Sequence, residues 1–169
     1  APGALEPLEQ AKAHGRAIFL AGCHFGATYL QALVLAARGW NIHAVGKFPG
    51  RVGQALRASD AVFAERYGTG RTTFLDVDDP DAEVPGTMLQ LLMTGGVLSN
   101  VFDENNAFSK PRTLFGRAVH GGSGMDLILR RFTDDRVVVV TPFLIRTGDD
   151  SFRFETDRQQ LSVRIAYRM

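Results

Sequence analysis

The sequence predicts an α/β protein with a mixed, mostly parallel sheet flanked by helices. Short apolar runs of strand length alternate with amphipathic stretches of helix length over most of the chain. Strand, helix and strand over residues 16–45 have the size of a right-handed βαβ unit. The run at residues 136–145 is β-branched and apolar enough for a central strand. The length of 169 residues fits a single domain over residues 1–169.

The first part of the chain predicts regular βα alternation. A helix over residues 5–14 has acidic residues early and Lys12 late, which suits the helix dipole, and Gly15 ends it. The helix over residues 26–38 has apolar residues at intervals of three and four, and Gly39 ends it. We expect further helices over residues 51–67 and 86–94, and strands over residues 16–21, 41–45, 72–77 and 97–102.

The second part predicts a less regular arrangement. A polar loop over residues 103–112 is followed by a strand over 113–119, a Gly-rich loop over 120–123 and a helix over 124–132. Pro142 should mark the end of the strand over 136–145, or a bulge in it, because proline cannot donate to a ladder. Residues 151–155 and 161–167 alternate in polarity as edge strands do, and a helix is the alternative for 161–167.

The composition excludes several classes of protein. Lys plus Arg number 19 and Asp plus Glu 18, so the net charge of +1 gives no general attraction to nucleic acid or to an anionic membrane. No apolar run approaches the 18 residues or more of a membrane span, and we expect neither a span nor a signal peptide. The single cysteine, Cys23, excludes an internal disulfide, and the histidines lack the spacing of a metal site. We therefore expect a cytoplasmic protein without metal or cofactor.

His24 is the first candidate for a catalytic residue. It follows the apolar strand over residues 16–21 and precedes the helix over 26–38. A residue between a strand and the next helix lies at the carboxyl edge of the sheet, where open α/β folds bind ligands. There its imidazole can act as a general base toward a hydroxyl or an amine. The alternative is a structural histidine that caps the helix.

The segment around His24 resembles a known family. Residues 15–26, GRAIFLAGCHFG, are similar to the catalytic-histidine segment of the lipid A biosynthesis (lauroyl/myristoyl) acyltransferases, in the lysophospholipid acyltransferase superfamily. The resemblance implies an acyltransferase-like core. It also implies that His24 is a general base that accepts a proton while an acyl group leaves a thioester of coenzyme A or acyl carrier protein. Residues 35–40, 98–105, 114–117 and 138–143 resemble later segments of the family in the same order.

The chain departs from the family at the acid that supports the histidine. The family has a carboxylate five positions after the histidine, and Tyr29 occupies that position here. In triad chemistry, a neutral group in place of such an acid costs about four orders of magnitude in rate. Asp103, in an acidic loop that follows a strand, can replace the acid or bind a substrate amine. The alternatives are a solvated loop for Asp103 and a core aromatic for Tyr29, whose hydroxyl can otherwise bond His24 or substrate.

Other polar residues are candidates for substrate binding. Glu104 and Asn105 share the loop of Asp103. Lys47, Arg51 and Arg117 can bind a phosphate, sulfate or carboxylate, and Arg51 and Arg117 resemble functional arginines of the family. Surface charges are the alternative for all three. The Gly-Gly-Ser-Gly sequence at residues 121–124 lacks a P-loop ending and predicts a turn in which a serine caps a helix.

Three functions remain open from the sequence. The first is an enzyme, or enzyme subunit, that acylates a soluble small-molecule intermediate of natural-product biosynthesis with His24 as base. The second is a subunit of a two-chain enzyme that uses the scaffold for cyclisation of an amine with loss of an anionic leaving group. The third is a non-catalytic stabilising subunit. Family members have a membrane anchor and extra helices around this core, so we expect a partner chain or a second copy to cover it.

Overall fold

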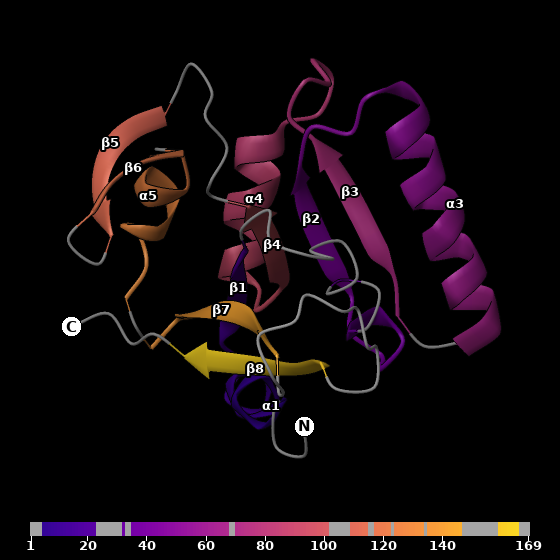
Figure 1. The fold of residues 1–169 in the computed structure, drawn as a ribbon, viewed down its shortest axis with the longest axis horizontal. Helices are drawn as coiled ribbons and strands as arrows, with labels where there is room; N and C mark the ends of the chain where they lie inside the picture. Colours follow the sequence, from indigo (N-terminus) through magenta and orange to yellow (C-terminus); the bar gives the residue numbers. More distant parts are fainter. Residues whose placement is uncertain are drawn as a thin grey trace.

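The computed structural model describes residues 5–22, 32, 35–67, 70–101, 109–114, 117–122, 124–133, 135–146 and 159–165. Helices and strands alternate over most of this length (Figure 1). The helices are α1 (Glu6–Ala13), α3 (Gly50–Tyr67), α4 (Val84–Met93) and α5 (Gly124–Leu129). The strands are β1 (Ala17–Gly22), β2 (Ile42–Gly46), β3 (Thr72–Asp76), β4 (Val97–Val101), β5 (Ser109–Leu114), β6 (Arg117–Gly122), β7 (Val137–Arg146) and β8 (Gln159–Ile165).

Six of these strands form one sheet in the order β3-β2-β4-β1-β7-β8. The pairings β3–β2, β2–β4, β4–β1 and β1–β7 are all parallel, and only the last pairing, β7–β8, is antiparallel. A separate antiparallel pair joins β5 and β6. The predicted fold class, a mostly parallel sheet flanked by helices, is therefore confirmed.

Strand β1 lies inside the sheet, and all six of its residues are buried. Its side chains alternate between the two faces, as in any strand. Ile18 and Leu20 join a cluster with Leu8 of α1 and with Trp40. Phe19 joins a second cluster on the opposite face, with Met88 and Leu92 of α4. An apolar run without polar alternation is what a strand covered on both faces requires.

Helix α3 packs near the edge strand β3 with very little apolar burial (Figure 1). Only Gly53 and Asp60 of its 18 residues are buried. The Asp60 side chain accepts a hydrogen bond of 2.7 Å from the backbone N–H of Thr72, the first residue of β3. Gly53 lies so close to the Phe48 carbonyl that a Cβ would overlap it. A glycine and a buried hydrogen bond therefore fix α3, while Val52 and Val62 stay more than half exposed.

The sequence predicted most of the main sheet correctly. Strands over 16–21, 41–45, 72–77 and 97–102 correspond to β1, β2, β3 and β4 within one residue at each end. The helix over 51–67 is α3, and the helix over 86–94 is α4, which starts two residues earlier. In the helix expected over 26–38, Ala32, Leu35 and Ala36 are helical and Gly39 has a left-handed φ of 89°. The remainder of that helix before residue 35, and the strand expected over 151–155, lie outside the described residues.

Three predictions for the region after residue 108 were wrong. Residues 109–112 are not loop but the start of β5, which pairs with β6 in a hairpin, so the single strand over 113–119 is also wrong. The Gly-rich loop over 120–123 is wrong as well, because β6 continues to Gly122, where it pairs with Ser109. Strand β5 was not predicted because it contains Lys110 and Pro111, and such a polar, proline-containing sequence is unlike that of a buried strand. Helix α5 ends at Leu129, three residues earlier than predicted.

Strand β7 runs through Pro142 rather than ending or bulging there. Its pairing with β1 extends only from Val137 to Val140. Beyond that point β7 pairs with β8, in which Pro142 lies opposite Val163. Pro142 therefore occupies the part of β7 that has a ladder on one side, which is where a sheet tolerates proline.

Two helical glycines give a matched test of how α3 packs. Gly53→Ala should lower the free energy of unfolding by about 1–3 kcal/mol, because the added methyl group overlaps the Phe48 carbonyl. Gly86→Ala in α4 should raise it by roughly 0.5–1 kcal/mol, because a Cβ there meets only ordinary contacts. Urea unfolding of both variants checks this. Equal effects of the two substitutions would contradict the close packing of α3.

Candidate functional site

The carboxyl ends of four adjacent parallel strands form one edge of the sheet, which we call the carboxyl edge. Gly22 of β1 pairs with Val101 of β4, so the two strands end level. On the other side of β4, Asn100 pairs with Val45 of β2, and β2 and β3 end level where Gly46 pairs with Asp76. The segments that follow these strands therefore all leave from the same edge, where α/β proteins bind ligands.

The two predicted catalytic residues follow β1 and β4, the central pair of the six-stranded sheet. His24 comes two residues after Gly22, and Asp103 comes two residues after Val101. His24, Tyr29, Asp103, Glu104 and Asn105 themselves lie outside the described residues.

The two predicted arginines lie on different elements. Arg51 is exposed in the first turn of α3, shortly after β2 leaves the carboxyl edge. Arg117 is the first residue of β6, opposite Leu114 in the β5–β6 hairpin. The described part of the chain thus places Arg51 beside the main sheet and Arg117 in the separate hairpin.

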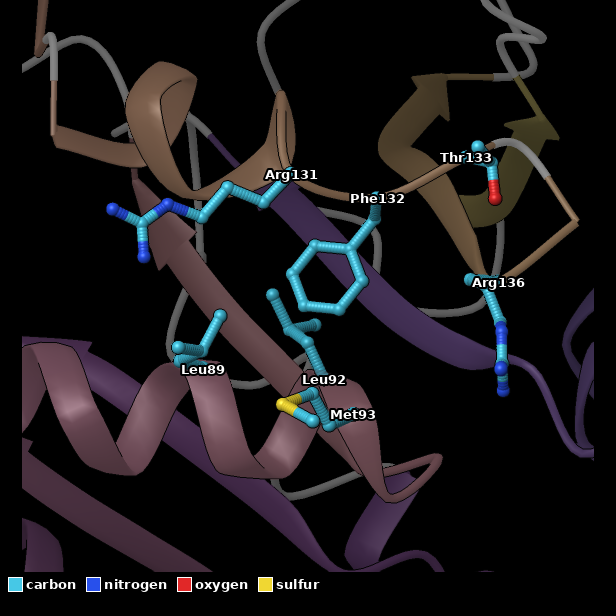
Figure 2. Close-up of a pocket in the computed structure, with 7 residues that line it drawn as sticks. All are labelled: Leu89, Leu92, Met93, Arg131, Phe132, Thr133 and Arg136. Carbon is cyan, nitrogen blue, oxygen red and sulfur yellow. The ribbon is translucent and has the colours of Figure 1, made fainter.

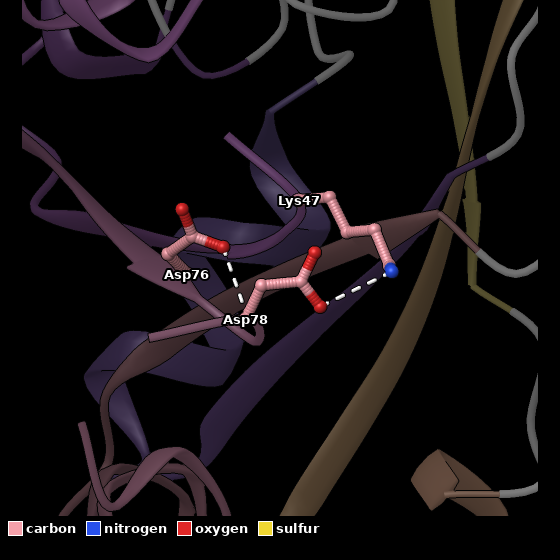
Figure 3. A network of polar contacts seen from close by, with 3 residues as sticks. All are labelled: Lys47, Asp76 and Asp78. Carbon is pink, nitrogen blue, oxygen red and sulfur yellow. Dashed lines mark hydrogen bonds and ion pairs between the residues drawn. The ribbon is translucent and has the colours of Figure 1, made fainter. Parts of the chain in front are cut away.

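Lys47, a further candidate for anion binding, is engaged by a carboxylate. Its Nζ lies 3.1 Å from Oδ1 of Asp78, and the backbone N–H of Asp78 donates a hydrogen bond of 3.1 Å to Oδ1 of Asp76 (Figure 3). Both side chains of the ion pair are more than half exposed, so the pair stabilises the fold by at most about 1 kcal/mol. An anion bound by Lys47 would compete with Asp78 for the same ammonium group.

Asn100 is a polar residue at this edge that the sequence analysis missed. It is half-buried near the end of β4, and its Nδ2 donates a hydrogen bond of 3.0 Å to the carbonyl of Val45 in β2. In the ladder it also lies opposite Ala21 of β1. An asparagine near the end of an apolar strand, just before an acidic stretch of sequence, was the signal that could have identified it. Its side chain links β4 to β2 beside the segments that lead to His24 and Asp103.

A cavity lined by described residues lies at the opposite, amino edge of the sheet (Figure 2). Met93 at the end of α4 and Arg136 just before β7 are among its lining residues. Both precede a strand, so they lie where the strands begin. This cavity is therefore distinct from the candidate site at the carboxyl edge.

Neither a metal site nor a known relative identifies the function of this chain. Among the described residues, no group of histidine, cysteine, aspartate and glutamate side chains could hold a metal ion. In the same residues, no helix is both long enough and apolar enough to cross a membrane. A scan against protein-family models and a search of curated proteins give no match to this chain.

His43 is a half-buried histidine within β2. It alternates with Ile42, so it belongs to the same face as Val45, which packs with Met88 of α4. Helix α4 contains no ionisable side chain that could compensate a charge on this face. Burial lowers the pKa of His43 below its ordinary value of 6.5.

The lowered pKa of His43 predicts a loss of stability in mild acid. The unfolded chain binds a proton on this histidine more readily than the folded chain, so the stabilisation is complete above the unfolded pKa of 6.5. It is lost as the pH falls below that value and through the folded pKa. His43→Gln should flatten the decline in the free energy of unfolding between about pH 7.5 and 5. His14→Gln, on the exposed end of α1, is the matched control. Identical urea-unfolding profiles for wild type and His43→Gln would contradict the prediction.

Proposed function

We propose that this chain is an acyltransferase-like enzyme, or the catalytic subunit of one, in which His24 is the general base. The supporting observation is the level ending of β1 and β4 at the Gly22–Val101 pair. Two residues extend the chain by at most about 7 Å, so His24 and Asp103 both start from neighbouring points on one edge. A catalytic base and the acid that orients it need this arrangement.

The segments that resemble the acyltransferase family support the same assignment. Residues 15–26, 98–105 and 138–143 overlap β1, β4 and β7, which are three adjacent strands of the sheet. A resemblance spread over distant parts of the sequence is thereby concentrated around one strand, β1. The segment at 114–117 includes the ends of β5 and β6 that meet in the hairpin.

The proposed reaction transfers an acyl group from a thioester to a small polar acceptor. His24 accepts the proton of the acceptor's hydroxyl or amine as that atom forms a bond to the thioester carbonyl carbon. The carbon–sulfur bond then breaks, and the imidazolium returns the proton to the departing thiolate. The proton and the acyl group are both accounted for in these steps without a metal or a redox cofactor.

Asp103 acts in place of the family's acid, whose sequence position is occupied here by Tyr29. A carboxylate that accepts a hydrogen bond from the second ring nitrogen fixes the imidazole tautomer and stabilises the imidazolium. Tyr29, Glu104 and Asn105 then remain to bind the acceptor. Arg51 and Arg117 are the candidates for the phosphate groups of a coenzyme A or acyl carrier protein donor.

A second candidate is a subunit whose site is complete only with a partner chain. The observation that favours it is α3, an 18-residue helix in which only Gly53 and Asp60 are buried while Val52, Val62 and Tyr67 are all more than half exposed. Apolar groups that gather on one exposed helix are common at protein interfaces. Together with its partner, such a subunit could also catalyse the cyclisation of an amine with loss of an anionic leaving group. The two candidates differ in whether the isolated chain uses a thioester.

Release of free thiol from a panel of acyl-coenzyme A donors, with small amine and alcohol acceptors, tests the proposal. His24→Asn should lower kcat by about 10²–10⁴, the usual contribution of a general base. Asp103→Asn should lower kcat by up to about 10⁴ with little change in KM, because the substrate still binds while the imidazole is misoriented. His14→Asn is the matched control, because His14 is exposed at the end of α1.

Two results would contradict the proposal. A His24→Asn variant with wild-type thiol release would remove His24 from the chemistry. A wild-type chain that releases no thiol from any donor, either alone or with a partner chain, would contradict acyl transfer.

A further inference from the structure

A cavity of about 390 Å³ lies between the last turns of α4 and the segment that joins α5 to β7. This volume is in the lower part of the roughly 300–1,000 Å³ range of small-molecule sites. Leu89, Leu92 and Met93 line it from α4, and Phe132 and Thr133 line it from the opposite side. In Figure 2, the leucines point from α4 toward the Phe132 ring. The base of the cavity is therefore apolar.

Two arginines complete the lining of this apolar base. Figure 2 shows Arg131 and Arg136 on either side of the Phe132 ring. Both are exposed, and within the described residues the Arg131 side chain has no ion pair. An apolar base with two flanking guanidinium groups suits a ligand that has an apolar body and a negative charge.

Among the described residues near the cavity, arginines outnumber carboxylates. The backbone N–H of Ala17 donates to the carbonyl of Arg136, which brings Arg16 beside the cavity rim. Arg16 has a buried Nε without a hydrogen-bond partner in the described structure. Among the described residues, the carboxylate close to these arginines is that of Asp135. It accepts a hydrogen bond from the Thr133 side chain and interacts with Arg136 and Arg16. Arg136 and Arg16 thus share one described carboxylate, which also accepts a hydrogen bond from Thr133.

The cavity is separate from the site that contains His24. It lies where the strands begin, and β1 spans six residues from this edge to Gly22. At about 3.3 Å per residue the two edges are roughly 17–20 Å apart. A ligand in this cavity would not reach the segment after β1.

We propose that this cavity is a binding site for a small organic anion with an apolar chain, for which a medium-chain carboxylate is the simplest example. The chain lies against Leu89, Leu92 and Phe132, and the carboxylate pairs with Arg131 or Arg136, which lie on opposite sides of the Phe132 ring. This site is additional to the acyl-transfer site and does not depend on it.

Calorimetric titration of the full chain tests the proposal with three probes. Decanoate combines the apolar chain with the anionic group, decyltrimethylammonium keeps the chain and reverses the charge, and butyrate keeps the charge and shortens the chain. Decanoate should bind saturably, and the other two should bind at least about tenfold more weakly, since each lacks one of the two contributions. Decanoate should also raise the melting temperature, because it binds only the folded chain.

Paired substitutions at Met93 test the role of charge without disturbing the core. Met93 lines the cavity yet is 66% exposed, so both a carboxylate and an ammonium group are tolerated there. Met93→Glu should weaken decanoate binding about tenfold or more, and Met93→Lys should leave it equal or stronger. The double variant Arg131→Gln/Arg136→Gln should also weaken binding at least about tenfold, while Arg57→Gln on α3 should change it less than about twofold.

Three results would overturn the proposal. The first is a wild-type chain that shows no saturable binding of decanoate. The second is equal binding of decanoate and decyltrimethylammonium. The third is equal decanoate binding by Met93→Glu and Met93→Lys, with melting curves that show both variants folded.

Discussion

The parallel pairing of β1 with β4 is the constraint on which the rest of the structure depends. Strand β1 is buried along its whole length, with Leu20 on the α1 face and Phe19 on the α4 face. A shift by one residue would exchange these faces and place each side chain in the wrong cluster, so packing on both faces fixes the register. The same register sets Gly22 against Val101. The core thereby determines where the segments that carry His24 and Asp103 begin.

The two edges of the sheet have different chemistry. The carboxyl edge has an asparagine that links two strands, and an ion pair between Lys47 and Asp78 beside Asp76. The amino edge has an apolar cavity with Arg131 and Arg136 in its lining. Polar groups at the carboxyl edge suit proton transfer and acceptor binding, whereas the cavity suits an apolar chain with an anionic group. One small sheet can therefore support two sites for different ligands.

The sequence predicted the elements whose pattern follows from burial. Strand β1 is continuously apolar because helices cover both faces, and α3 was recognised from its helical pattern although little of it is buried. The edge strand β8 was expected from alternation, and it pairs antiparallel with β7 as an edge strand can. These predictions required only local pattern and the preference of βα units for parallel sheets.

Elements whose formation depends on partners were not predictable in the same way. Strand β5 contains Lys110 and Pro111, and it forms because its backbone pairs with that of β6. The local sequence pattern does not indicate this pairing. Pro142 is tolerated in β7 because the β1 ladder has already ended, which only the register reveals. The hydrogen bond of Asn100 to Val45 could be known only once β2 and β4 were known to be adjacent. The sequence drew attention to the segments after β1 and β4, although which strands are neighbours had to come from the structure.

The central claim is that the β1–β4 register brings the segments of His24 and Asp103 together at one edge. Cross-linking of introduced thiols in a Cys23→Ser background tests it most directly. A short bismaleimide should join His24→Cys to Asp103→Cys within one chain, as mass spectrometry of the digested protein would detect. It should not join His24→Cys to Thr94→Cys, because Thr94 precedes β4 at the amino edge. Cross-linking of the 24–94 pair, or its absence from the 24–103 pair, would contradict the account.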